Sequence, residues 1–268
     1  MRNALIFLLA VAALAEEPAK ETGLTGTLSE EEWKKLHDLS DEKRPKPAGE
    51  MVKVGDMQAY LSLPKGKPPF PAVTVIHEWW GLNEHIKFWA DRLAADGYAA
   101  VAVDLYEGKV ATTRDEAMAS MKAVVPAKAV QRLKAAHDFL KSDERVQAKR
   151  RASLGWCFGG GYSLQLALAA KDLDASVLYY GRLVFDATEL GRIKAKMLGV
   201  FGNLDSGIPP ADVDRFEKAL KEAKVDATIL RYDAEHAFAN PSGGRYDKEA
   251  AEDAWGKVRE FLKSSLRE

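Results

Sequence analysis

Cys157 stands in a setting that could make it a nucleophile. It is the single cysteine of the chain and lies at the centre of the stretch Gly155-Trp156-Cys157-Phe158-Gly159. The apolar run 152–156 leads into this stretch, and a helix-forming run follows at 162–170. The stretch has the form of a nucleophile elbow, a sharp strand-to-helix turn that presents its central side chain above a sheet. The amino end of the helix would stabilise a thiolate and an oxyanion.

The same turn allows a structural interpretation. Glycine-rich strand-to-helix turns are common in nucleotide-binding folds, and a cysteine in such a turn can serve packing alone. The chain has no Gly-x-x-x-x-Gly-Lys-Ser/Thr sequence, so a P-loop does not explain the turn. The five residues by themselves leave both interpretations open.

An elbow requires an acid and then a histidine, each shortly after a later strand. Asp205 follows the apolar run 197–201, and His236 follows the run 228–232. A single loop aspartate usually forms a turn or a helix cap, and a single histidine is usually structural. However, Cys157, Asp205 and His236 agree in chain order and in position relative to the strands. Together they favour a nucleophile, an orienting acid and a base.

The other four histidines fit a catalytic role less well. His37 lies in a polar N-terminal segment, and His85 and His137 lie on helical stretches, where we expect them to face solvent. The segment at 77–81 reads His-Glu-Trp-Trp-Gly, which is not the His-Glu-x-x-His pattern of zinc enzymes. A single cysteine also excludes a thiolate-bound zinc or iron–sulfur cluster. We therefore expect no metal and no cofactor.

The elements that must position these residues alternate along the chain. Continuous apolar runs, typical of strands buried on both faces, occupy 72–76, 98–103, 152–156, 176–180, 197–201 and 227–232. Amphipathic helical stretches lie between them, at 84–95, 114–122, 128–141, 158–170, 211–223 and 247–265. This alternation predicts an α/β fold with a mostly parallel sheet and helices on both faces. A hairpin over 51–63 predicts an antiparallel N-terminal edge.

The first fifteen residues have the pattern of a signal peptide. Arg2 precedes an apolar run over 4–15, whose length lies within the ~7–15 residues of a signal-peptide core. Ala13-Leu14-Ala15 has the form of a cleavage site. A buried helix and a retained anchor are the alternatives. We expect cleavage near Ala15 and an exported protein, periplasmic or secreted, that is not held in a membrane. The polar residues 16–50 are predicted to form an extension, and 51–268 the main domain.

Charge and composition limit the partners. The 268 residues include 39 basic and 40 acidic side chains, which give a net charge of −1, and 47% are hydrophobic. This balance suits one globular domain and lacks the basic surface of a nucleic-acid-binding protein. We expect a small-molecule substrate and no nucleic acid as partner.

Several blocks of this sequence resemble the dienelactone hydrolase family, a branch of the α/β-hydrolase fold with a cysteine nucleophile. The resemblance covers about residues 51–265, and the blocks lie at 75–83, 97–106, 155–160, 179–181 and 235–238. It implies an α/β-hydrolase fold and an enzyme that hydrolyses esters or lactones.

The resemblance also implies roles for single residues. Cys157, His236 and Asp205 would form the catalytic triad. Glu78 would contact the resting thiol and swing away when substrate binds. The backbone N–H groups of Trp79 and Phe158 would form the oxyanion hole.

Two departures from the family pattern bear on the substrate. Dienelactone hydrolases hold a substrate carboxylate with two arginines, one just beyond the Asp-Leu-Tyr block and one four residues after the histidine. Here Lys109 lies near the first position and Asn240 occupies the second. Lys109 could replace an arginine only as a point charge, without its bidentate fork. Dienelactone is therefore not the expected substrate, and Trp79, Trp80 and Trp156 either make the pocket more apolar or belong to the core.

The expected chemistry is hydrolysis through an acyl-thioester at Cys157. His236 would act as base and then as acid, while Asp205 orients it. Because a thiolate is a good leaving group, activated esters, enol-lactones and thioesters are more suitable substrates than amides. The alternative is a non-catalytic member of the fold that binds a ligand or senses oxidants through its thiol.

Overall fold

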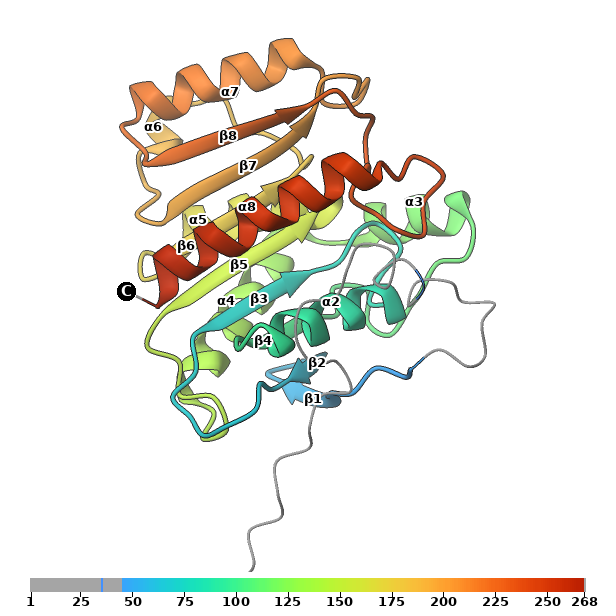
Figure 1. Cartoon of the computed structure of the whole chain (residues 1–268), viewed down its shortest axis with the longest axis vertical. Coiled ribbons are helices and arrows are strands. Elements are labelled where there is room, and N and C mark those ends of the chain that lie inside the picture. Colours follow the sequence, from blue (N-terminus) through green and yellow to red (C-terminus); the bar gives the residue numbers. More distant parts are fainter. Residues whose placement is uncertain (1–34, 36–44, 268) are drawn as a thin grey trace, which may run out of the picture.

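The computed structural model describes Lys35 and residues 45–267, and an eight-stranded sheet forms its centre (Figure 1). The strands are β1 (Glu50–Val54), β2 (Met57–Ser62), β3 (Ala72–Ile76), β4 (Ala99–Val103), β5 (Arg151–Trp156), β6 (Ala175–Tyr179), β7 (Lys196–Gly202) and β8 (Ala227–Tyr232). The helices are α2 (Glu84–Ala95), α3 (Arg114–Ala123), α4 (Pro126–Ser142), α5 (Phe158–Ala169), α6 (Ala187–Leu190), α7 (Pro210–Glu222) and α8 (Lys248–Leu266).

The strand order places the catalytic candidates at one edge of the sheet. The order is β1-β2-β4-β3-β5-β6-β7-β8, in which β2 runs antiparallel to both of its neighbours and the other pairs are parallel. The ends of the parallel strands are in register, with Ile76 opposite Gly155 and Trp156 opposite Tyr179. The loops that follow β3, β5, β7 and β8 therefore leave the sheet at the same edge.

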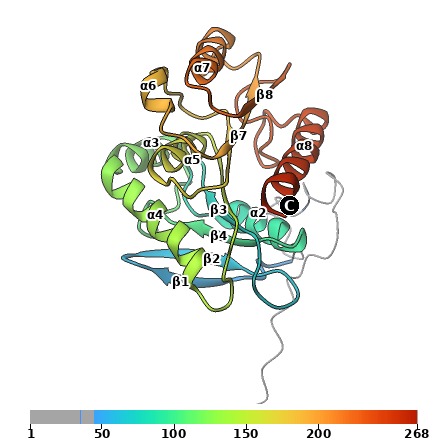
Figure 2. The ribbon, with the colours of Figure 1, turned by 90° about the vertical axis from the view of Figure 1, so that its left-hand side faces the viewer.

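Helices cover both faces of the sheet, as Figure 2 shows. One face packs against α4, α5 and α7 through side chains such as Leu133, Leu164 and Phe216. The other face packs against α2 and α8 through side chains such as Phe88 and Trp255. The central strands are apolar on both faces because each face has a helical layer to bury. The predicted mostly parallel sheet with an antiparallel N-terminal edge is confirmed.

The segment before β1 is fixed to the domain by a buried carboxylate. Asp91 on α2 accepts hydrogen bonds from the Ala48 N–H (2.9 Å), the Tyr60 hydroxyl (2.8 Å) and the Ser62 hydroxyl (2.6 Å). The predicted signal peptide at 1–15 and most of the predicted extension at 16–50 lie outside the described residues. Within the described residues, no helix is both long and apolar enough to cross a bilayer.

Two local predictions differ from the structure. The short helix α6 was not expected, because four residues are too few to show a periodicity; Asp186 caps it by accepting from the Thr188 and Glu189 N–H groups. The prediction that His137 faces solvent is wrong. His137 is buried at the amino edge of the sheet, with its Nε2 atom 3.1 Å from an oxygen of Asp172.

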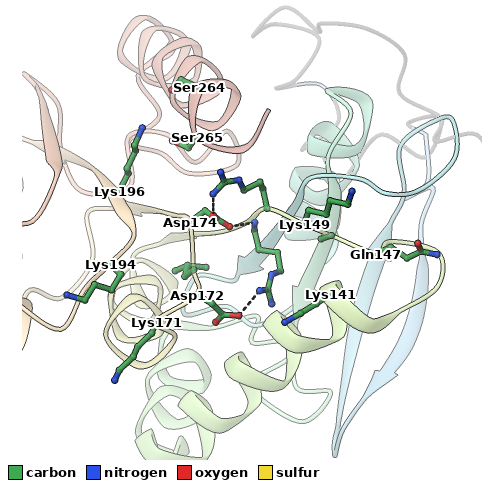
Figure 3. Close-up of a pocket in the computed structure, with 14 residues that line it drawn as sticks. Lys141, Gln147, Lys149, Lys171, Asp172, Asp174, Lys194, Lys196, Ser264 and Ser265 are labelled. Atoms are coloured by element: carbon green, nitrogen blue, oxygen red, sulfur yellow. Dashed lines mark hydrogen bonds and ion pairs between the residues drawn. The ribbon is translucent and has the colours of Figure 1, made fainter. Parts of the chain in front are cut away.

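A charged hollow of about 940 Å³ lies at this amino edge (Figure 3). Asp172 and Asp174 each form an ion pair with an arginine there: Arg151 with Asp172 and Arg150 with Asp174, both at 2.6 Å. The Arg151 guanidinium also donates to the carbonyl of His137. These contacts explain why α4 turns His137 toward the sheet.

Candidate active site

Cys157 lies at a strained turn between β5 and α5. Its backbone has φ 54° and ψ −115°, in a region that L-residues rarely adopt. A Cβ atom at Gly155 would collide with the carbonyl of Gly159, and one at Gly159 would collide with the carbonyl of Ile76. Both glycines are therefore required for β3, β5 and α5 to approach this closely. The turn lifts the Cys157 side chain above the carboxyl edge of the sheet.

His236 and Asp205 meet beside this turn. His236 Nδ1 lies 2.7 Å from Asp205 Oδ2, and the Asp205 side chain is fully buried. The other carboxylate oxygen of Asp205 accepts from the N–H groups of Gly207 (2.7 Å) and Ile208 (3.0 Å). Burial raises the pKa of Asp205, but these hydrogen bonds outweigh burial and lower it overall. Asp205 is therefore an ionised carboxylate that fixes the orientation of the His236 ring.

The charge of His236 depends on both of its neighbours. Burial lowers its pKa, but the hydrogen bonds and charges of Asp205 and Cys157 outweigh burial and raise the pKa to about 10. With Nδ1 directed at Asp205, the opposite side of the ring faces Cys157. The imidazole can therefore carry a proton beside Cys157.

Glu78 is a second buried carboxyl in the site. It is 8% exposed, and burial raises its pKa to about 7 despite the opposing effects of His236 and Asn240. Its Oε2 atom accepts from the side-chain amide of Asn240 at 2.5 Å. Among the described residues Asn240 is its hydrogen-bond partner, and no hydrogen bond joins Glu78 to Cys157. The expected contact with the resting thiol stays a prediction.

Both polar groups of the Asn240 side-chain amide form hydrogen bonds within the protein. Its NH₂ group donates to Glu78, and its Oδ1 atom accepts from the N–H (2.9 Å) and the hydroxyl (2.7 Å) of Ser242. The predicted substrate-binding residue thus holds a carboxylate of the chain itself.

The two predicted oxyanion-hole groups have no acceptor within the described part of the chain. Phe158 is the first residue of α5, where a backbone N–H has no intrahelical partner. The N–H of Trp79 follows Glu78 in the turn after β3. Both groups are free to donate to a substrate oxygen.

His77 fixes the turn that carries Glu78 and Trp79. It is fully buried, and its Nδ1–H donates to the carbonyl of Glu78 (2.5 Å) while its Nε2 accepts from the N–H of Leu105 (3.2 Å). Burial lowers its pKa to about 4, so the ring stays neutral in this tautomer. Its position directly before Glu78 was the available signal for this role.

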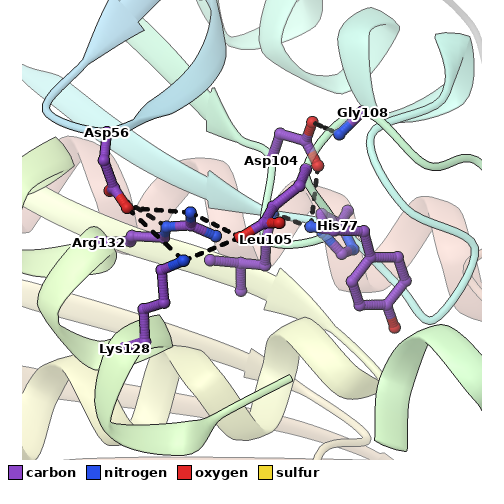
Figure 4. Close-up of polar contacts among 9 residues, drawn as sticks. Asp56, His77, Asp104, Leu105, Gly108, Lys128 and Arg132 are labelled. Atoms are coloured by element: carbon purple, nitrogen blue, oxygen red, sulfur yellow. Dashed lines mark hydrogen bonds and ion pairs between the residues drawn. The ribbon is translucent and has the colours of Figure 1, made fainter. Parts of the chain in front are cut away.

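The loop after β4 is held from two sides (Figure 4). Asp104 accepts from the N–H groups of Tyr106 (2.9 Å) and Gly108 (2.5 Å). Glu107 forms ion pairs of 2.9 Å with Lys128 and with Arg132. This clamp orders the segment that carries Tyr106 and Lys109.

Lys109 itself is exposed and borders a separate hollow of about 150 Å³ together with Ser120, Val124 and Lys128. This hollow lies between the loop after β4 and helices α3 and α4. Within the described residues, no three His, Cys, Asp or Glu side chains gather as a metal site.

The aromatic residues divide between site and core. Trp156 is 2% exposed and packs on Trp89 and Tyr179, so it belongs to the core and not to a pocket. Trp79 and Trp80 are half-buried and lie edge to face, with ring centroids 5.0 Å apart.

Sequence reasoning missed two tyrosines of the site. The Tyr180 ring lies 5.1 Å from the His236 ring. Tyr106 is buried near enough to Cys157 for the cysteine charge to contribute to its raised pKa, after burial itself. Both tyrosines stand in the sequence blocks that carry the family resemblance, which was the only signal for them.

Comparison with known proteins agrees with this geometry. The model of the dienelactone hydrolase family matches residues 57–266. A putative carboxymethylenebutenolidase of Methylorubrum extorquens is 33% identical over 224 residues, which cover 78% of this chain and 77% of the relative. The chain belongs to the dienelactone hydrolase family. Protein usf of Aquifex pyrophilus is 34% identical to this family member over 219 residues, 78% of the chain and 94% of the relative.

Solved structures are similar over the same region. A putative dienelactone hydrolase from Klebsiella pneumoniae matches with a TM-score of 0.74 and 27% identity, over 80% of this chain and 97% of that one. A dienelactone hydrolase-like promiscuous phosphotriesterase from metagenomic libraries matches with a TM-score of 0.74 and 27% identity, over 81% and 96%. The resemblance inferred from the motifs is confirmed, and this dienelactone hydrolase family member is a hydrolase. The catalytic roles of the single residues stay predictions.

Proposed function

We propose that this hydrolase cleaves carboxylic esters or lactones through an acyl-thioester on Cys157. The observation that supports the proposal most strongly is the arrangement around His236. Its Nδ1 atom lies 2.7 Å from the buried carboxylate of Asp205, and its other side interacts with the Cys157 side chain at the elbow. This is the order of acid, base and nucleophile that acyl transfer requires.

The first half of the reaction forms the thioester. The Cys157 sulfur attacks the acyl carbon while His236 holds the thiol proton, and the carbonyl oxygen becomes an oxyanion. The N–H groups of Trp79 and Phe158 stabilise this charge. The C–O bond to the alcohol then breaks, and His236 returns its proton to the departing oxygen.

The second half releases the acid. Water attacks the thioester carbon, and His236 accepts a proton from that water. The C–S bond breaks, and the thiolate leaves with His236 protonated beside it. Because the raised pKa of His236 favours this ion pair, the enzyme is ready for another cycle.

Glu78 has a supporting role in this mechanism. Asn240 donates to its carboxyl group, and His236 is the base that interacts with Cys157. With a pKa of about 7, Glu78 loses its proton near neutrality and then adds a negative charge that favours protonated His236. Glu78 therefore adjusts the proton affinity of the base, and it moves toward the thiol only if Asn240 releases it.

We propose neutral substrates over anionic ones. Asn240 is engaged by Glu78 and Ser242, and Lys109 borders the hollow beside α3 and α4. A substrate carboxylate would lack the two charged partners that each contribute about 1.5–3 kcal/mol. The kcat/KM for a neutral lactone should exceed that for an anionic dienelactone, and the reverse order would contradict this assignment.

The test of the reaction itself is a burst experiment with p-nitrophenyl acetate. We expect a burst of p-nitrophenol equal to the enzyme concentration, and an acetyl group on Cys157 in the mass spectrum of quenched enzyme. Cys157→Ala is the control for background hydrolysis. Steady release without acetylation of Cys157 would remove the thioester mechanism and favour the binding or thiol-sensing alternative.

We also propose that the protein is exported. Arg2, the apolar run over 4–15 and the Ala13-Leu14-Ala15 site support a cleaved signal peptide. Protein isolated from its native host should begin at Glu16, and an intact chain from the cytoplasm would contradict export.

A further inference from the structure

Helix α3 leaves its apolar side chains on the surface. Ala117 is the one residue of this ten-residue helix that is buried. Met118 and Met121 are 42% and 37% exposed, and Val110, just before the helix, is 48% exposed. A helix at the surface of a domain normally turns such side chains toward the core. Exposed apolar side chains that gather in one segment indicate a contact surface.

The helix does not depend on these side chains for its structure. Thr113 and Glu116 form a capping box, in which the Thr113 hydroxyl accepts from the Glu116 N–H and the Glu116 carboxylate accepts from the Thr113 N–H. The carboxylate also accepts from the N–H and the hydroxyl of Thr112. The first turn is thus fixed by its own polar groups, which leaves Met118 and Met121 available for another contact.

The exposed face is continuous with the active site. Arg114, Met118 and Met121 lie at i, i+4 and i+7, so they share one side of the helix. The Arg114 guanidinium lies over the Trp79 ring, 5.9 Å from its centroid. The N–H of Ala111 donates to the carbonyl of Trp80 at 2.9 Å. Trp79 directly follows Glu78, so these contacts join α3 and the segment before it to the turn that carries Glu78. In Figure 1, α3 lies at the same end of the molecule as the loop between β8 and α8, which carries His236.

We propose that Val110, Met118 and Met121, here called the α3 platform, bind the hydrocarbon chain of a neutral ester whose carbonyl lies at Cys157. This inference rests on the proposed ester hydrolysis and adds the substrate class, esters with an extended alkyl group. Methionine side chains are flexible and polarisable, which suits them to alkyl chains of different lengths. Each methylene that moves fully from water onto such a surface increases kcat/KM by about fourfold.

Two other occupants fit the surface less well. Three exposed side chains supply far less than the ~800 Å² per partner that a stable interface between two copies requires. A membrane-binding helix carries an excess of lysine and arginine on its polar face. In contrast, the two basic residues of α3, Arg114 and Lys122, are balanced by Asp115 and Glu116. The continuity with Trp79 and Trp80 favours the substrate chain.

The test compares p-nitrophenyl acetate with p-nitrophenyl octanoate, both below their critical micelle concentrations. The variant is Met118→Gln/Met121→Gln, in which glutamine keeps helix propensity and length but not apolarity. The control is Met51→Gln, because Met51 is also an exposed methionine, 48% exposed, but lies on edge strand β1. We expect wild type to prefer octanoate, and the double variant to lower the octanoate-to-acetate ratio of kcat/KM about tenfold. Met51→Gln should leave the ratio unchanged.

Each other outcome has a definite meaning. If wild type hydrolyses both esters but the double variant keeps its ratio, the α3 platform does not bind the alkyl chain and the inference is wrong. If sedimentation shows a dimer that the double variant loses, with no change in ratio, the surface is an interface between copies. If wild type hydrolyses neither ester, the proposed ester hydrolysis is itself wrong, and the role of the α3 platform is wrong with it. Circular dichroism confirms that each variant is folded.

Discussion

The two edges of the parallel sheet each carry a carboxyl group, but the partners and the pKa shifts of these two groups differ. At the amino edge, Asp172 pairs with Arg151, and although burial raises the pKa of Asp172, its hydrogen bonds lower it to about 2. At the carboxyl edge, Glu78 is buried beside Asn240, and burial raises its pKa to about 7. A hollow of about 940 Å³ lies at the amino edge, away from Cys157.

The two carboxyl groups differ in their partners, and these partners set the charge of each group. A carboxylate with a nearby arginine stays ionised at every physiological pH and contributes to structure. A buried carboxyl group next to an amide and a histidine changes its charge near neutrality, which is the property that proton transfer requires. Both environments occur in one fold, because the parallel strands begin at the amino edge and end at the carboxyl edge, and different loops line each edge.

The largest expected effect comes from removal of the proposed nucleophile or the proposed base. Cys157→Ala and His236→Ala should each lower kcat/KM for p-nitrophenyl acetate by at least about 10³-fold, because both act in one reaction unit. The double variant should be no slower than the slower single variant. Additive losses in the double variant would show that the two residues do not act together.

The next effect is on the acid that orients the base. Asp205→Asn should keep the fold but lower kcat by about 10²- to 10⁴-fold, because an amide neither fixes the His236 tautomer nor stabilises its charge. It should also lower the pKa of His236, since the hydrogen bond and charge of Asp205 raise it. NMR titration of the imidazole measures that shift. An unchanged pKa would show that Asp205 does not raise the pKa of His236.

A smaller, pH-specific effect is expected at Glu78. Its raised pKa means that it is neutral below about pH 7 and charged above. Glu78→Gln should therefore remove the step near pH 7 from the rate of iodoacetamide labelling at Cys157, and should lower kcat about tenfold. The control is Glu144→Gln, because Glu144 is exposed and lies away from the site. Identical labelling curves for wild type and Glu78→Gln would make Glu78 a structural residue.

The smallest effect on activity is expected at the amino edge. Arg151 is 4% exposed and pairs with Asp172 and the His137 carbonyl. Arg151→Met should lower the free energy of unfolding by about 1–3 kcal/mol, because it leaves polar groups without their donor, while kcat/KM per folded molecule stays the same. Urea denaturation and the ester assay measure the two quantities. A loss of activity without a loss of stability would contradict this prediction and would show that Arg151 at the amino edge affects the reaction at the carboxyl edge.

Local sequence patterns predicted most of the fold and the turn that carries Cys157. The apolar runs and amphipathic stretches correspond to β3 to β8 and to all of the longer helices, because burial imposes a period on each element. The elbow was predictable because its two glycines stand at fixed spacing around Cys157. A side chain at Gly155 would collide with Gly159, and one at Gly159 would collide with Ile76 on the neighbouring strand β3.

The rest depends on contacts that no local pattern contains. Glu78 and Asn240 are 162 residues apart, and their hydrogen bond exists only because β3 and the segment after β8 end at the same edge. Whether Trp156 faced a pocket or the core depended on which way the last residue of β5 pointed. His137 was misplaced because its buried partner, Asp172, comes from the loop before β6.

The position of β8 at the outer edge of the sheet has a consequence for synthesis on the ribosome. Cys157 is translated almost eighty residues before His236, and the loop that carries His236 comes into place only when β8 pairs with β7, where Gly202 lies opposite Tyr232. Until then the nascent chain holds the Cys157 thiol without the histidine that we propose as its base, and a thiol that stays protonated reacts slowly. A chain that terminates before residue 227 lacks β8 and the loop that carries His236, so under the proposed mechanism its thiol would have no base to accept its proton.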